Sequence, residues 1–147
     1  MAIAFAGEFQ VHRPAADVFV FLTDPEQFAP LLPDFQGLSV EDEKNFTVNV
    51  KVGISHIGGT ASLKLRLAAT EPPRKALYEG KGSVAGGSVD LNAGFELEED
   101  SAGWTRVRWK GEAHLFGPLL SVAGGLLEPL AKKNVQKLIS GLQKALL

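Results

Sequence analysis

Cysteine is absent from the 147-residue chain. Disulfide bonds, thiolate metal sites, iron–sulfur clusters and cysteine nucleophiles are therefore excluded. An excess of positive charge is also absent, because 15 Lys and Arg stand against 17 Asp and Glu, for a formal net charge of -2. Neutralising a nucleic-acid backbone requires a basic surplus. Nucleic acid is therefore not expected as a partner.

Long apolar runs are missing as well. The most apolar segment, residues 115–127, is interrupted by Pro118, Ser121, Gly124 and Gly125. A bilayer-spanning helix needs about 20 largely apolar residues, so no transmembrane segment is predicted. Residues 1–11 have no charged start and no long apolar core, so neither a signal peptide nor a transit peptide is expected. These absences favour a cytoplasmic protein, with a peripheral position at the inner face of the membrane left open.

The composition is that of a folded globular protein. Hydrophobic residues make up 45% of the chain and charged residues 22%, which is close to the average for globular domains. A chain of this length is expected to bury one core. There is no internal repeat, linker or shift in composition, so residues 1–147 are predicted to form a single domain.

Alternation of apolar and polar residues predicts an antiparallel sheet of about seven strands. A period of two is typical of strands that bury one face. Pairs of glycine or proline and short polar segments separate the strands, with turns expected at 56–59, 71–73, 86–87 and 100–103. The individual strands that the pattern delimits are 3–11, 46–54, 61–67, 77–84, 89–97 and 107–113.

Helical spacing occurs in two places. After the first strand, Pro14 and Pro25 mark the starts of two short helices, because proline is tolerated in a first turn, and Thr23 or Asp24 can cap the second of them. The end of the chain, residues 130–146, has the apolar stripe of a long amphipathic helix. Since Pro129 lacks an N–H, a bend or a helix start is expected there.

The order of elements predicts an α+β fold. A strand, two short helices, about six further strands and a long helix favour a curved antiparallel sheet that packs one face against the C-terminal helix. Glycines such as Gly80, Gly82, Gly94 and Gly111 would let the strands bend. A strongly curved sheet that closes on one helix is expected to leave an apolar cavity between them.

Dispersed glycines, prolines and aliphatic residues carry a resemblance to a known family. The chain resembles the CoxG family of carbon monoxide dehydrogenase subunits, within the START-like or SRPBCC superfamily of helix-grip proteins, over nearly its whole length. Where that family usually reads Pro-Gly after the second helix, this chain has Pro33-Asp34. The residues that carry the resemblance are Gly7, Pro14, Val18, Leu22, Asp24-Pro25, Pro33, Val52-Gly53, Pro73, Gly80-Lys81-Gly82, Thr105, Gly111 and Gly117.

The resemblance implies a helix-grip protein that binds or carries a hydrophobic small molecule, lipid-like or quinone-like, without catalysis or a cofactor. It also implies association with a carbon monoxide dehydrogenase-type molybdenum hydroxylase. Tyr78, Asn92 and Trp104 have donors that could orient a head group. The residues predicted to contact the ligand are Phe28, Leu31, Leu32 and Phe35 at the mouth, Val50, Leu65, Phe95 and Trp109 on the sheet, and Leu126, Leu127 and Leu130 on the helix.

Catalytic and metal chemistry have little support in the sequence. The three histidines, His12, His56 and His114, are isolated and have no second ligand at metal spacing, so no metal site is expected. A triad of Ser55, His56 and Asp90 has no nucleophile elbow to support it. No catalytic residue is therefore predicted.

Two alternative functions stay open. Residues 115–130 are apolar almost all round, and four lysines follow on the same helix, which would suit docking to a membrane or a partner enzyme. An aromatase or cyclase of the same superfamily is the other alternative. That function needs an acid or base in the cavity, and none is visible among the inward-facing positions.

Overall fold

The computed structural model describes the backbone of residues 1–54, 57–84, 86–117 and 119–147, and the side chains of these residues except 54, 57–58, 84 and 119–124. The helices are α1 (Ala15–Thr23), α2 (Pro25–Phe28), the short 3-10 turn η1 (Ala29–Leu31) and α3 (Leu119–Ala145). The strands are β1 (Ala2–Val11), β2 (Phe35–Val40), β3 (Asn45–Ile54), β4 (Ile57–Glu71), β5 (Lys75–Val84), β6 (Gly87–Glu99) and β7 (Thr105–Phe116).

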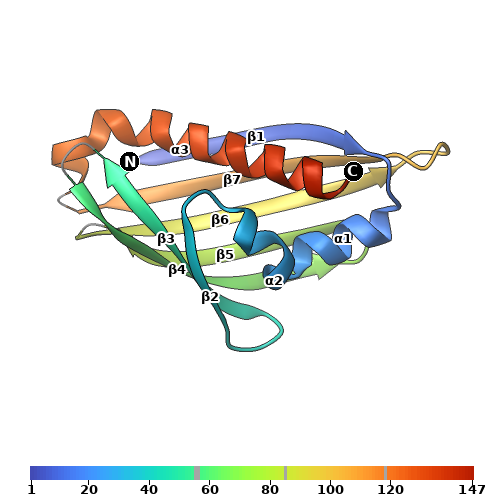
Figure 1. Ribbon diagram of the computed structural model, residues 1–147, viewed down its shortest axis with the longest axis horizontal. Helices are drawn as coiled ribbons and strands as arrows, with labels where there is room; N and C mark the ends of the chain where they lie inside the picture. Colours follow the sequence, from blue (N-terminus) through green and yellow to red (C-terminus); the bar gives the residue numbers. More distant parts are fainter. Residues whose placement is uncertain (55–56, 85, 118) are drawn as a thin grey trace.

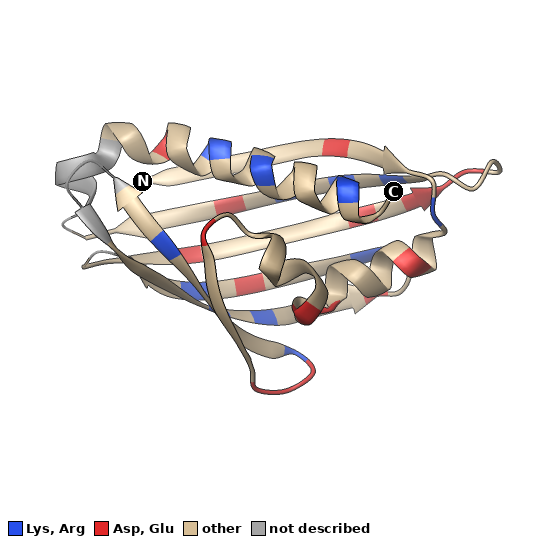
Figure 2. Cartoon of the chain, viewed as in Figure 1, with Lys and Arg blue, Asp and Glu red and all other residues tan. Residues whose placement is uncertain are grey.

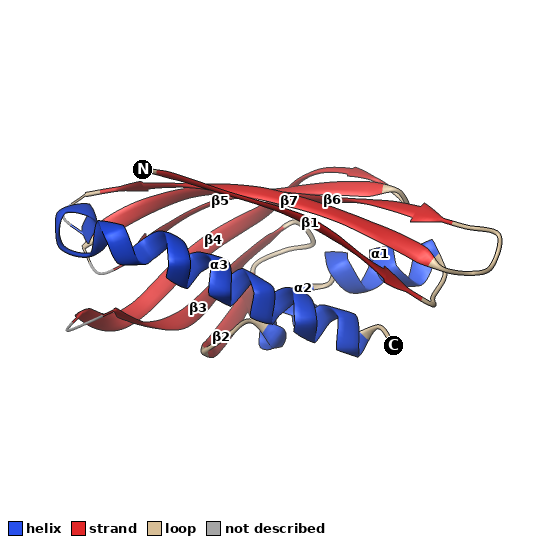
Figure 3. Cartoon of the chain, turned by 90° about the horizontal axis from the view of Figure 1, so that it is seen from above, coloured by secondary structure: helices blue, strands red, loops and turns tan. Residues whose placement is uncertain are grey.

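The seven strands form one antiparallel sheet in the order β1-β7-β6-β5-β4-β3-β2 (Figure 1). The helices lie on one side of this sheet, and β2 and β3 curl round to the same side, so that α3 is held between the two ends of the sheet (Figure 3). The α+β helix-grip fold predicted from the sequence is confirmed. Alternation along each strand places one set of side chains against α3 and the other set on the outer face.

The two short helices begin where the sequence predicts them. Pro14 occupies the N-cap position of α1. Asp24 caps α2, its side chain accepting a hydrogen bond of 3.1 Å from the backbone N–H of Glu26, and Pro25 follows at the first helical position. Aspartate at the N-cap satisfies a backbone donor that the helix itself leaves free. Buried Val18, Phe19 and Leu22 fix α1 against the sheet.

Of the two alternatives expected at Pro129, a bend or a helix start, the start is wrong, because α3 begins at Leu119 and continues through this residue to Ala145. Proline deprives the carbonyl four residues earlier, that of Gly125, of its helical donor. Both Gly125 and Pro129 are exposed. Water can therefore satisfy the freed carbonyl, and the helix tolerates the proline.

Two further details differ from the sequence prediction. Phe35–Val40 forms the edge strand β2, which alternation alone did not delimit because Gln36, Gly37 and Ser39 interrupt its apolar pattern. Gly58 and Gly59 were expected in a turn, but they pair with Gly53 and Val52 inside the β3–β4 ladder. The predicted turn residue His56 lies outside the described residues, as does Ser55.

Gly7 on β1 leaves space for the side chain of Trp109 on β7. Gly7 pairs with Trp109 in the register of these strands. A Cβ atom added to Gly7 would lie 2.5 Å from Cζ2 and 2.8 Å from Cε2 of the Trp109 indole. The indole therefore covers the glycine, and the missing side chain provides the space for it.

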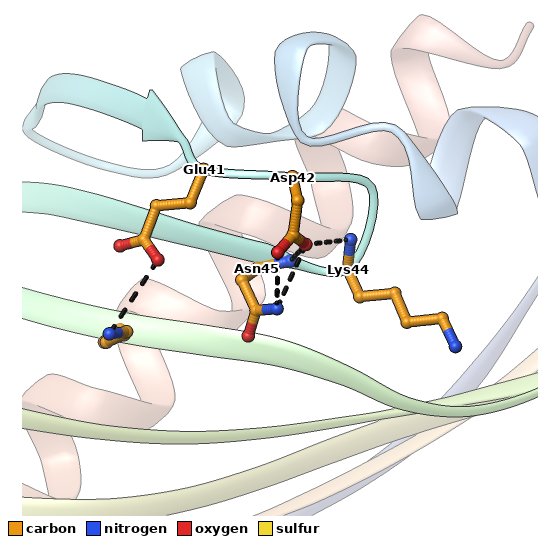
Figure 4. Close-up of polar contacts among 5 residues, drawn as sticks. Glu41, Asp42, Lys44 and Asn45 are labelled. Atoms are coloured by element: carbon orange, nitrogen blue, oxygen red, sulfur yellow. Dashed lines mark hydrogen bonds and ion pairs between the residues drawn. The ribbon is translucent and has the colours of Figure 1, made fainter.

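The turn between β2 and β3 is held by one carboxylate (Figure 4). Oδ1 of Asp42 accepts hydrogen bonds from the backbone N–H groups of Lys44 and Asn45, both at 2.8 Å, and from Nδ2 of Asn45 at 3.0 Å. The backbone bond from Lys44 and the bonds from Asn45 lower the pKa of Asp42. Beside the turn, the Glu41 carboxylate lies 3.8 Å from Nζ of Lys64 on β4. The turn thus fixes the edge of the sheet that curls round α3.

Arg13 ties the end of α3 to the start of α1. Its Nε donates to the carbonyl of Leu146 at 3.0 Å, and its Nη2 donates to the carbonyl of Leu147 at 2.9 Å. The hydroxyl of Thr105, a fully buried polar residue, donates to the carbonyl of Arg13 at 2.6 Å. A cation at the C-terminal end of a helix satisfies free carbonyl groups and complements the helix dipole.

Candidate functional site

A cavity of about 310 Å³ lies between α3 and the inner face of the sheet. This volume is at the lower end of the range of about 300–1,000 Å³ typical of small-molecule pockets. Its interior is apolar, formed by side chains from five strands and from α3. The apolar lining residues are Ile3, Val50, Val52, Ala61, Leu63, Val89, Ala113, Leu115, Leu127, Leu130 and Ala131.

Charged groups line the cavity only at its edge. Asp34, Lys51, Lys133 and Lys137 contribute to the lining, and all four are exposed. Asn134, which also lines the cavity, is half-buried. The exposed charges define the opening, which lies between α3, β3 and the connection from η1 to β2. We call Asp34, Lys51, Lys133 and Lys137 the rim.

Asp34 occupies an unusual backbone position at the rim. Its φ is 56°, in the left-handed region that side chains other than Gly, Asn and Asp seldom adopt. Its carbonyl accepts a hydrogen bond of 2.9 Å from the backbone N–H of Lys51 on β3. Glycine would fit this left-handed turn without strain, and the aspartate that occupies it adds a carboxylate beside the cavity.

Of the eleven residues predicted to contact a ligand, the structure brings three together at this cavity, Val50, Leu127 and Leu130. Four others, Phe28, Leu32, Phe35 and Leu65, pack around buried Phe46 and Val48 in a neighbouring cluster. Leu31, Phe95 and Trp109 belong to the core cluster between α1, the sheet and the end of α3. Leu126 is 53% exposed. None of these last eight residues lines the cavity.

The sequence prediction did not include the buried floor of the cavity. Ile3, Val89, Leu115 and Ala61 are each less than a tenth exposed and line it. Alternation placed Ile3, Val89 and Ala61 on the inner face, but it could not say which inward residues border free space. That distinction depends on where the helix axis crosses the sheet.

The potential head-group donors lie elsewhere. The Tyr78 hydroxyl donates to the carbonyl of Leu22 at 2.9 Å, inside an aromatic cluster with Phe28 and Phe46. Asn92 is exposed. Trp104, which is also exposed, stacks on His12 with ring centroids 4.7 Å apart. None of the three lines the cavity.

Tyr78 provides a prediction on alkaline stability. Burial, with a smaller contribution from the Asp24 carboxylate, raises the pKa of Tyr78 above its ordinary value of 10.0. Above pH 10 the unfolded chain loses the phenol proton while the folded chain keeps it, so stability is expected to fall as pH rises. The added slope approaches about 1.4 kcal/mol per pH unit.

Urea unfolding at several alkaline pH values measures this slope, and Tyr78→Phe is expected to remove it. Because Tyr78 is the only tyrosine of the chain, the absorbance of tyrosinate also reports its ionisation directly. If the free energies of unfolding of the wild type and Tyr78→Phe changed in parallel between pH 10 and higher pH, the prediction would be wrong.

A larger hollow of about 860 Å³ lies on the outer face of the sheet. Its floor is formed by small or short side chains such as Ala6, Ala69 and Gly94, and its border includes the ion pair between Glu8 and Arg108, 3.4 Å apart. No helix covers this face (Figure 3). The hollow lies over the backbone of a face that no helix covers, whereas the inner cavity lies beneath α3 and has buried apolar side chains in its lining.

The described residues offer little for catalysis or metal binding near the cavity. His12 stacks on Trp104, and Nε2 of His114 lies 3.1 Å from Glu112 on the outer face. Within the described part of the chain, no three His, Asp or Glu residues are grouped to hold a metal ion. In the same residues, no helix has the length and apolar character needed to cross a membrane.

Solved structures share this fold at low sequence identity. A conserved protein from Geobacillus kaustophilus is 16% identical, with a TM-score of 0.83 over 99% of this chain and 95% of that one. A START superfamily protein from Mycobacterium smegmatis is 12% identical, with a TM-score of 0.74 over 97% and 96%. The Zhui aromatase/cyclase from a Streptomyces species is 15% identical, with a TM-score of 0.73 over 99% and 93%.

No curated protein matches the sequence. A family model does match, over residues 7–147, and that model describes CoxG, one of the subunits of carbon monoxide dehydrogenase. The match includes both short helices, the whole cavity lining except Ile3, and the whole of α3. With an apolar cavity gripped between α3 and a seven-stranded sheet, this chain belongs to the CoxG family of carbon monoxide dehydrogenase subunits.

Proposed function

We propose that this protein binds and carries a hydrophobic small molecule, lipid-like or quinone-like, in the cavity between α3 and the sheet, without catalysing a reaction. The apolar cavity of about 310 Å³ carries the proposal. Apolar surface that lines a cavity gains free energy when an apolar ligand covers it and removes it from water. Membership of the CoxG family supports the further proposal that the carried molecule serves a carbon monoxide dehydrogenase-type molybdenum hydroxylase, which we propose to be cytoplasmic.

The distribution of titratable groups supports carriage over catalysis. General acid–base catalysis needs a titratable group within hydrogen-bonding reach of the reacting atoms. The described interior of the cavity is lined by aliphatic side chains, and the charged lining residues stand at the exposed rim. The Zhui aromatase/cyclase shares this fold, but a cyclase-like reaction here would need such a group deep in the cavity. The described lining has none there.

The first test is native mass spectrometry of the purified protein, followed by organic extraction and identification of the released molecule. A stoichiometric quinone or lipid supports the proposal and names the cargo. A ligand-free mass that stays unchanged on addition of menadione and dodecanol would contradict it.

Filling the cavity is expected to abolish binding. Ala131 lies on α3, is half-buried and lines the cavity, so Ala131→Phe places a phenyl ring in the space of the ligand. We expect affinity for menadione or dodecanol to fall by about tenfold or more, because overlap with the ring must be relieved before a ligand enters. Calorimetric titration measures the affinity.

Ala145→Phe is the matched control, because Ala145 lies on the same helix but is exposed. It should leave affinity unchanged. The milder variant Ala113→Leu fills the cavity from the sheet side if Ala131→Phe does not fold. Full binding by a folded Ala131→Phe protein would show that the ligand does not occupy this cavity.

A second candidate function is docking to a membrane or to the partner enzyme. Leu126 is 53% exposed, and the described part of α3 carries four lysines against one glutamate. The remaining part of the apolar segment that favoured docking, side chains 118–124, lies outside the described residues. Co-sedimentation with anionic vesicles that weakens with salt would favour this candidate, since lysines near a membrane surface act through screened electrostatic attraction.

A further inference from the structure

The rim of the cavity carries three cations and one carboxylate. Lys133 and Lys137 lie one turn apart on α3, so their side chains project from the same side of the helix. Lys51 comes from β3, and its backbone is hydrogen-bonded to that of Asp34. Figure 2 shows basic residues along the described part of α3 and on β3 beside it. Two separate elements therefore bring positive charge to the same opening.

These lysines differ from others nearby in their pairing. Lys132, adjacent in sequence to Lys133, lies 3.1 Å from the Glu128 carboxylate, and Lys64 on β4 lies 3.8 Å from Glu41. Among the described residues, Lys51, Lys133 and Lys137 form no ion pair. Like charges one turn apart on a helix repel each other. An anion held at the rim would relieve that repulsion.

The apolar interior and the cationic rim adjoin one another. Leu127, Leu130 and Ala131 line the cavity one turn before the rim residues Lys133 and Lys137 on the same helix. Half-buried Asn134 lies between the two lysines in sequence and adds an amide donor at the same place. A ligand with an apolar chain and a charged end could thus satisfy both surfaces at once.

We infer that the cavity takes an anionic amphiphile, with its apolar chain against the aliphatic interior and its carboxylate or phosphate head at Lys51, Lys133 and Lys137. This inference rests on the proposed function, because it specifies the chemistry of the molecule that the cavity carries. Charge-assisted hydrogen bonds from ammonium groups hold such a head, and exposure at the rim spares it full desolvation. Asp34 disfavours an anion, but it is one carboxylate beside three ammonium groups.

The test compares three long-chain probes that differ in the head group, together with acetate as a carboxylate without the chain. Isothermal titration calorimetry at neutral pH, below the critical micelle concentration, measures binding of dodecanoate, dodecanol, dodecyltrimethylammonium and acetate to the wild-type protein. We expect dodecanoate to bind about tenfold more tightly than dodecanol, dodecyltrimethylammonium to bind more weakly than both, and acetate to show no detectable binding. High salt should reduce the difference in affinity between dodecanoate and dodecanol, because it screens the attraction to the lysines. Dodecyl phosphate tests a phosphate head on a long chain. Inorganic phosphate shows whether the free ion binds without the chain.

Variants that neutralise lysines test whether the preference for an anionic head group arises at the rim. The double variant Lys133→Gln with Lys137→Gln is expected to lose about tenfold in affinity for dodecanoate while its affinity for dodecanol stays unchanged. The matched control, Lys132→Gln with Lys144→Gln, removes the same charge from the same helix at residues that do not line the cavity. It should retain the dodecanoate preference.

The outcomes separate this inference from the proposed function. Equal binding of dodecanoate and dodecanol, or equal losses in the rim and control variants, would overturn the anionic preference while leaving hydrophobic carriage intact. If acetate or inorganic phosphate bound as tightly as the chain-bearing probes, the rim would be a site for small ions only, and the inference of an anionic amphiphile would be overturned. No binding of any dodecyl probe would overturn both.

Discussion

Replacing Phe46 by alanine is expected to lower the free energy of unfolding by about 3–5 kcal/mol, the usual cost of removing a buried phenyl ring. Phe46 is 2% exposed and lies at the centre of an aromatic cluster, with its ring centroid 5.9 Å from those of both Phe28 and Tyr78. These neighbours come from α2 and β5 and are themselves held by other contacts, so they cannot close the void. Urea unfolding followed by circular dichroism measures the loss.

The control is Phe116→Ala, which removes the same ring from a position that is 49% exposed. Its effect should stay within about 0.5 kcal/mol, as is usual for surface substitutions. A loss of less than about 1 kcal/mol for Phe46→Ala would show that the cluster can collapse, contrary to the packing described above.

The second large effect is expected at Gly82 on β5. A Cβ atom at this position would overlap the carbonyl oxygen of Ser62 on β4, and it would lie 2.5 Å from Cδ2 of Leu63. Because the oxygen belongs to the backbone of the neighbouring strand, the overlap cannot be relieved by a change of rotamer. Gly82→Ala is expected to cost about 1–3 kcal/mol through overpacking and a shift of β4.

Gly37→Ala is the control variant, because a Cβ atom at Gly37 would meet no atom within 4 Å. At such a site the substitution restricts the unfolded chain and is expected to stabilise the protein by up to about 1 kcal/mol. The two alanine variants should therefore shift the urea midpoint in opposite directions. A Gly82→Ala protein as stable as the wild type would contradict the close approach of β4 and β5.

Much of the fold could be predicted because local rules determine it. Asp24 followed by Pro25 is a capping pattern, and alternation in β6 and β7 produces one buried face, as at Phe95 and Leu97. Pro129 shows where a local rule fails. The penalty of an internal proline depends on whether water reaches the freed carbonyl, which is a property of the folded surface rather than of the sequence around it.

The candidate site was less predictable than the fold, for a geometric reason. Val50 and Leu65 have the same apolar character and the same inward parity on adjacent strands, yet Val50 lines the cavity and Leu65 packs beside Phe46. Their difference arises from where α3 crosses the sheet. Lys133 and Lys137, the two rim lysines on α3, lie on the polar side of an amphipathic helix, where a sequence pattern predicts exposure to solvent and does not indicate a nearby opening.

The pairing of β1 with β7 has a consequence for synthesis of the chain. Ile3 lies opposite Ala113 and Val11 opposite Thr105, so β1 leaves the ribosome well before its neighbour β7 is made. Until then β1 exposes an open edge and apolar residues that can join another nascent chain. This order of events makes the pairing of β1 with β7 a late step in closure of the sheet, because it cannot precede synthesis of β7.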